Sequence, residues 1–156
     1  MIARNPHFNL PDHRCHGSRA VDAFHTATAL MELPFRSEDE DAALLTAAWT
    51  CHEHWILADG ETPWGRLTAP LLLARAHLTV GRLQLGLVLA RRAWRLTGHH
   101  HLGQDAAAEA LTLLIHITRR LARHTETEHW LHLGTAVLAQ ITSSSVRRHL
   151  ENAIMN

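Results

Sequence analysis

The chain has 156 residues, a formal net charge of zero and 46% hydrophobic residues, which suits one globular domain and excludes wholesale disorder. No apolar run approaches the roughly 20 residues of a membrane helix, and the N-terminus lacks the apolar core of a secretory signal. Two cysteines, Cys15 and Cys51, are too few for a disulfide framework, so the cytoplasm is the expected compartment.

The composition is rich in arginine and histidine, with 15 residues of each, and contains neither lysine nor tyrosine. This bias is typical of a GC-rich bacterial genome. Because there is no lysine, Schiff-base chemistry and a phosphate-binding loop lysine are excluded. Charge is unevenly spread, since residues 1–62 hold ten acids and four arginines, whereas residues 63–156 hold five acids and eleven arginines.

The first seventeen residues contain two prolines and a glycine without apolar periodicity, which predicts an irregular arm over 1–17. Residues 18–156 are expected to form a single helical domain. Ser18 is a candidate cap for a first helix that ends near Leu33, before Pro34.

A capping box at Ser37 and Glu40 predicts a second helix from Glu38 to Ala58. The stretch TCHEHW lies inside it. His52 and His54 point about 200° apart on a helix, so they cannot chelate one ion together. Cys51 falls on the apolar stripe and is expected to pack in the core.

Two prolines offer starts for a third helix, which we expect over about 69–80, with a tight turn at Gly81. The fourth helix is expected over 82–97, with Gly98 ending it. It carries two apolar stripes, which predicts packing on two sides and a place in the middle of an array.

Further apolar periodicity predicts helices near 105–123, 125–141 and 146–154. The polar face of the helix near 105–123 holds residues such as Glu109, Thr112 and His116. No segment shows the alternation of a strand. The expected fold is therefore an all-α array of six to seven antiparallel helices.

The stretch from Ala74 to Leu96 resembles a tetratricopeptide hairpin, because Ala74, Gly86 and Ala93 stand where that family keeps small residues, and Gly81 stands at its turn. His77 and Leu83 occupy two positions where the family has aromatic residues. The resemblance covers about one repeat and implies antiparallel helices that approach closely.

Arginine pairs recur every 28 residues, at 91–92, 119–120 and 147–148. Coding bias explains such pairs, but a basic surface for phosphate or carboxylate groups is the alternative, since guanidinium groups recognise both. Nucleic acid is a lesser candidate partner for this arginine-rich half. The candidate binding residues are Trp64, Arg91, Arg92, Arg95, Arg119, Arg120 and Arg123.

A transition-metal site is the second candidate, because His129 and His132 lie three apart on one helix, with Glu126 three residues before them. The cluster His13-Arg14-Cys15-His16 is another set of potential ligands. Histidines at the edge of a polar helix face are the simpler interpretation of the first set, and an irregular arm is the simpler interpretation of the second.

Motifs of covalent catalysis are absent from the sequence, which contains no G-x-S-x-G and no dinucleotide or phosphate-binding loop. We therefore expect a non-catalytic interaction or regulatory module that acts through a protein partner or self-association. The alternative is a small helical metal- or ligand-binding protein or an enzyme of a specialised pathway.

Overall fold

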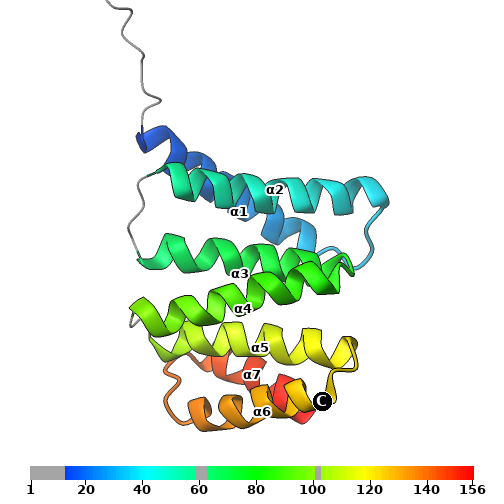
Figure 1. Cartoon of the computed structure of the whole chain (residues 1–156). Helices are drawn as coiled ribbons and strands as arrows, with labels where there is room; N and C mark the ends of the chain where they lie inside the picture. The colour runs from blue at the N-terminus through cyan, green and yellow to red at the C-terminus, as the bar shows by residue number, and fades with distance from the viewer. Residues whose placement is uncertain (1–12, 59–62, 101–102) are drawn as a thin grey trace, which may run out of the picture.

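The computed structural model describes residues 13–58, 63–100 and 103–156. These residues form seven α-helices and no strand, which confirms the all-α array (Figure 1). The helices are α1 (His13–Met31), α2 (Glu38–Leu57), α3 (Pro63–Thr79), α4 (Leu83–His100), α5 (Gln104–Arg120), α6 (His124–Leu138) and α7 (Ser144–Met155). No described helix has the length and hydropathy that crossing a membrane requires.

The sequence signal for the start of a helix is confirmed at α2. The Ser37 hydroxyl accepts a hydrogen bond from the Glu40 amide at 3.2 Å, and the Glu40 carboxylate accepts one from the Ser37 amide at 2.7 Å. This is the predicted capping box, and it pairs two N–H groups that would otherwise lack partners.

Three predicted boundaries are wrong. Helix α1 begins at His13 rather than Ser18, so residues 13–17 of the predicted arm are helical. Residues 1–12 lie outside the described residues. Helix α3 uses the first proline start, Pro63, and carries Pro70 inside. Gly98 lies within α4, which continues to His100. Glycine and proline bias a helix boundary, and the tertiary context can override that bias.

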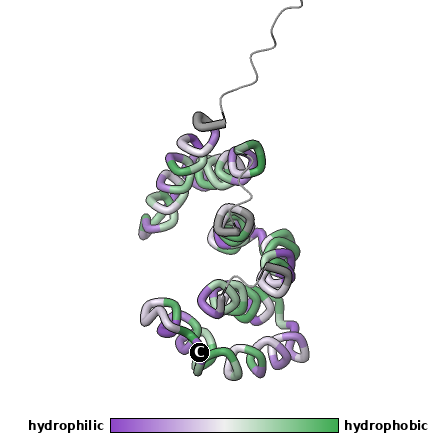
Figure 2. The backbone as a smooth tube through the Cα atoms, turned by 90° about the vertical axis from the view of Figure 1, so that its left-hand side faces the viewer, coloured by the Kyte–Doolittle hydropathy of each residue, from purple (hydrophilic) through white to green (hydrophobic). Residues whose placement is uncertain are grey.

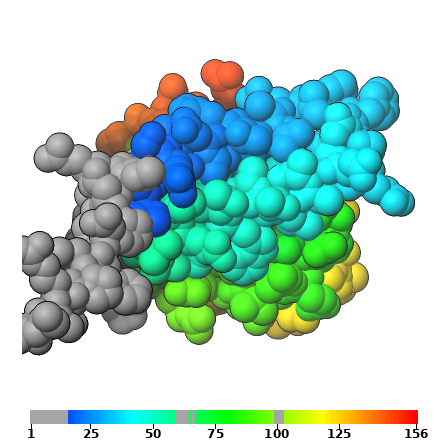
Figure 3. All heavy atoms as spheres, turned by 90° about the horizontal axis from the view of Figure 1, so that it is seen from above, coloured from blue at the N-terminus to red at the C-terminus, as the bar shows by residue number. Residues whose placement is uncertain are grey.

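The helices form two rows. Each helix packs against the next one in the chain, and α1, α3, α5 and α7 also pack successively against one another, whereas no such contacts join α2, α4 and α6. We call the first set the inner row and the second the outer row (Figure 2). Seen from above, α4 emerges beyond α2 on one long side, and orange C-terminal residues emerge beyond α1 on the other (Figure 3). The predicted central place of the fourth helix fits this arrangement.

Two hairpins share the same turn. Gly81 between α3 and α4 has φ +79°, and Ala122 between α5 and α6 has φ +54°. The amide of the next residue closes each turn, from Arg82 to the His77 carbonyl at 2.8 Å and from Arg123 to the Thr118 carbonyl at 2.9 Å. The equivalent positions are 41 residues apart (122 − 81), so the 28-residue spacing of the arginine pairs is not the period of these hairpins.

The core runs along the array between the two rows. Cys51 is fully buried, as its stripe predicts, and burial raises the pKa of its thiol to about 11, an effect that the neighbouring Trp55 offsets only in part. Of the tryptophans, Trp130 is buried, and Trp94 packs against it with ring centres 6.0 Å apart.

Candidate functional site

Arginines line the edge where the inner helices end. Because α1, α3, α5 and α7 run in the same direction, their negative dipole ends lie together at this edge (Figure 1). The Arg36 guanidinium donates to the Leu33 carbonyl at 3.3 Å and to the Thr79 carbonyl at 3.5 Å. These contacts neutralise carbonyl groups at the ends of two neighbouring helices.

Two of the predicted binding residues, Arg119 and Arg120, also donate hydrogen bonds to carbonyl groups at helix ends. Arg120 donates to the Leu78 carbonyl at 3.0 Å. Arg119 donates to the carbonyls of Ala153 and Ile154, the second at 3.2 Å. Both guanidinium groups therefore hold α5 to the ends of α3 and α7, which reduces what they can offer to an external anion.

Arg91 and Arg123 converge on Glu126, the predicted metal ligand. The Arg91 Nε donates to Glu126 Oε1 at 3.0 Å, and Arg123 Nη1 donates to Oε2 at 3.3 Å. The Trp130 indole N–H also donates to this carboxylate at 3.3 Å. Burial raises the pKa of the Glu126 carboxyl, but the hydrogen bonds from Arg91, Trp130 and Arg123 outweigh burial and lower it.

The structure does not bring the predicted metal ligands together. His129 and His132 are exposed on α6, and the Glu126 carboxylate is turned toward the two arginines. No group of three or more histidine, cysteine or acidic side chains suited to a metal ion occurs in the described part of the chain. Trp64 is the second residue of α3, but its side chain lies outside the described residues.

His16 and His54, which lie far apart in sequence, meet between α1 and α2. The Nδ1 atoms of His16 and His54 are 2.7 Å apart, which is a hydrogen bond between two imidazoles. No spacing rule could have found this pair, because it depends on how the α1–α2 hairpin closes.

Arg92 and Arg95, on the exposed side of α4, make no hydrogen bond or ion pair with another described residue. Burial lowers the pKa of the nearby His52 imidazole, and the Arg92 charge lowers it further. Of the six predicted arginines, these two are therefore available to a partner.

Exposed apolar side chains accompany them on the outer row. Val88 on α4 is 58% exposed and Ile56 on α2 is 63% exposed, with Leu85 and Trp49 also exposed on the same two helices. We call these four residues the outer strip. Sequence periodicity places Leu85 on an apolar stripe, with no sign that it would be left uncovered, whereas it groups Val88 with the polar residues of this helix.

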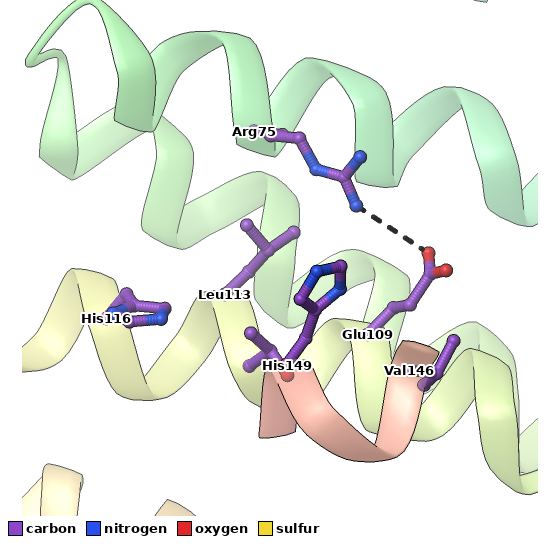
Figure 4. A pocket seen from close by; sticks show the side chains of 7 residues that line it. Arg75, Glu109, Leu113, His116, Val146 and His149 are labelled. Atoms are coloured by element: carbon purple, nitrogen blue, oxygen red, sulfur yellow. Dashed lines mark ion pairs between the residues drawn. The ribbon is translucent and has the colours of Figure 1, made fainter. Parts of the chain in front are cut away.

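A pocket of about 350 Å³ opens on the inner row, between α3, α5 and α7 (Figure 4). We call it the inner pocket. It is lined by Arg75, Glu109, Thr112, Leu113, His116, Val146 and His149. The predicted polar face of α5 supplies Glu109, Thr112 and His116, whereas Arg75 and His149 were not predicted, because only the packing of the inner row brings α3 and α7 to this face.

The comparisons with known proteins give no relative: no family model, no curated protein and no solved structure matches the chain.

Proposed function

We propose that the protein is a non-catalytic helical interaction module that binds a protein segment on its outer row, and that this segment belongs to a second copy of the chain. The observation that carries the proposal is the outer strip with two unpaired arginines beside it. Uncovered apolar side chains next to free charges are typical of a surface that a partner covers.

The surface extends over two helices. On α4, Leu85, Val88 and Arg92 follow at intervals of three and four residues and share one face. On α2, Trp49 contacts His52, with ring centres 5.7 Å apart. The charge of Arg92 lowers the pKa of His52, so the two side chains are close enough to interact although α2 and α4 do not pack directly.

A complementary segment exists on the same chain. Between α1 and α2, Phe35 is 90% exposed, and the exposed acids Glu38 and Asp39 follow it. An apolar tip beside two carboxylates matches apolar side chains beside Arg92 and Arg95. The opposite charges of the two halves of the chain support the same pairing.

The tetratricopeptide resemblance is consistent with an interaction role. A Cβ added at Gly86 would lie 3.4 Å from the Ala74 carbonyl oxygen, so a small residue suits this crossing of α3 and α4. We propose that the α3–α4 hairpin is tetratricopeptide-like, that the protein is bacterial, and that it acts in the cytoplasm.

Two other functions are less well supported. A role as a small ligand-binding protein is favoured by the inner pocket and has its own test below. Binding of nucleic acid through the C-terminal arginines is weakened, because Arg91, Arg119, Arg120 and Arg123 are engaged within the protein.

Sedimentation velocity over a range of concentrations tests the proposal. The double variant Arg92→Glu/Arg95→Glu should weaken self-association at least about tenfold, because two attractive contacts become repulsive. Adding Glu38→Arg and Asp39→Arg should restore self-association, because the charges on both contacting surfaces are then reversed. Arg19→Glu, an exposed site on α1, is the matched control.

The outcomes divide clearly. Concentration-dependent association that is lost and then restored by the charge reversal supports the proposal. A wild-type chain that stays monomeric at every concentration contradicts it. Association that the Arg92→Glu/Arg95→Glu variant leaves unchanged contradicts it as well.

A further inference from the structure

The inner pocket is lined by an arginine side chain, Arg75, from a helix whose central stretch is otherwise almost entirely buried. Between Leu67 and His77, α3 is buried except for Thr68, which is half-buried, and Arg75, which is exposed. Helices that are apolar around their whole circumference sit inside a protein. Arg75 is therefore the group that this central stretch presents to the hollow between α3, α5 and α7 (Figure 4).

The Arg75 guanidinium has no hydrogen-bond acceptor among the described residues, unlike the arginines that donate to carbonyl groups at helix ends. Its Nη2 lies 3.9 Å from Glu109 Oε2, which is too long for a hydrogen bond. Neither side chain donates or accepts a hydrogen bond with another described residue. Their side chains remain 45% and 35% exposed, so the pair is solvated, contributes little to stability and is easily separated by a ligand.

The pocket presents two opposite charges at a short separation, together with neutral polar groups and an apolar wall. Leu113 and Val146 supply the wall, from α5 and α7. His116 lies on the same side, and burial, aided by the charge of Arg119, lowers the pKa of its imidazole, so it adds no positive charge at neutral pH. A simple anion would meet the Glu109 carboxylate, and a simple cation would meet Arg75.

We propose that the inner pocket binds a free α-amino acid with an aliphatic side chain. A zwitterion carries its carboxylate and its ammonium on one carbon atom, so it can satisfy Arg75 and Glu109 together. Arginine binds the carboxylate with two parallel N–H groups, and the glutamate accepts from the ammonium. The aliphatic side chain then lies against Leu113 or Val146, which flank the His149 imidazole on either side in Figure 4.

The size of the pocket agrees with a small ligand. Ligand pockets span about 300–1,000 Å³, and this one, at about 350 Å³, is at the lower limit. A single amino acid fits within such a volume. The inference is independent of the outer strip, since the pocket is on the opposite row, and either proposal can fail without the other.

Isothermal titration calorimetry with leucine, isoleucine and valine tests the proposal on the full chain. N-acetyl-leucine lacks the ammonium, and leucine amide lacks the carboxylate, so each should bind about 10- to 100-fold more weakly than leucine. Arg75→Gln and Glu109→Gln should each cause a loss of similar size. Arg19→Gln, which removes an exposed arginine from α1 away from the pocket, is the matched control and should bind leucine normally.

Both pocket variants should fold, because the pair they break is solvent-exposed, and thermal unfolding without ligand checks this. No binding of any aliphatic amino acid at about 10 mM would overturn the proposal. Binding of both capped derivatives as tightly as leucine, or unchanged leucine binding by both folded pocket variants, would overturn it too.

Discussion

His77 offers the sharpest test of the packing. It is 1% exposed, and neither of its ring nitrogens has a hydrogen-bond partner. The equivalent position in the next hairpin is Thr118, whose hydroxyl donates to the Leu114 carbonyl at 2.8 Å. One hairpin therefore satisfies its buried polar group, and the other does not. We predict that His77→Leu, a change of similar volume, stabilises the protein.

The magnitude follows from two opposing terms. An unpaired buried donor or acceptor costs about 1–3 kcal/mol, which leucine removes. The edge-to-face contact between His77 and Trp49, with ring centres 6.4 Å apart, is lost at a cost of about 0.5–1 kcal/mol. The net gain should be about 1 kcal/mol, which raises Tm by about 2–4 °C for a chain of this size.

The gain should grow in acid. Burial, with a smaller effect of the Arg82 charge, lowers the pKa of His77 below its unfolded value of 6.5. The unfolded chain therefore takes up a proton first, and stability is lost as pH falls below about 6.5. His77→Leu removes this contribution, so its advantage should be larger at about pH 5.5 than at about pH 7.5.

Urea unfolding followed by far-UV circular dichroism at the two pH values measures both effects. His129→Leu, at an exposed site on α6, is the control and should change the free energy of unfolding by less than about 0.5 kcal/mol. A loss of 1 kcal/mol or more in His77→Leu at about pH 7.5 would refute the reasoning, since the imidazole would then be making a favourable contact.

Three further changes test other parts of the structure. Ala122 has φ +54°, so Ala122→Gly should stabilise the turn by about 1 kcal/mol in urea unfolding, whereas Ala139→Gly, at φ −66°, should destabilise; equal effects would contradict the strain. Glu126→Gln should lower stability by about 1 kcal/mol, because two arginines lose a charged partner, and no loss would mean that the contacts are solvated. In a Cys15→Ser variant, the remaining thiol of Cys51 should react with Ellman's reagent only on unfolding, since it is buried with a pKa of about 11, and rapid native labelling would disprove its burial.

Sequence reasoning succeeds where a signal is local. The capping box at Ser37 and the turn at Gly81 need only neighbouring residues, and both were predicted. The turn at Ala122 was missed, because alanine carries no preference for positive φ and adopts it here through the same carbonyl contacts that close the first turn.

The candidate site was harder to predict, because its members come from helices that meet only in the folded array. Glu126 and His129 have the spacing of a metal-binding element, yet the carboxylate is taken by Arg91 from a different helix. Arg75 has no neighbour in sequence that marks it. Its significance comes from α3 being covered on every other side, which depends on the packing of α1, α2, α4 and α5 around it.

The excess of arginine in the C-terminal half follows in part from the fold itself. Parallel inner helices align their negative ends at one edge, and guanidinium groups at that edge bridge carbonyls of neighbouring helices. Arginines that do this work, such as Arg119 and Arg120, are poor evidence for an anionic partner. The arginines that inform on function are those that lack a hydrogen-bond partner and also lie at a candidate binding surface: Arg92 and Arg95 beside the outer strip, and Arg75 in the inner pocket.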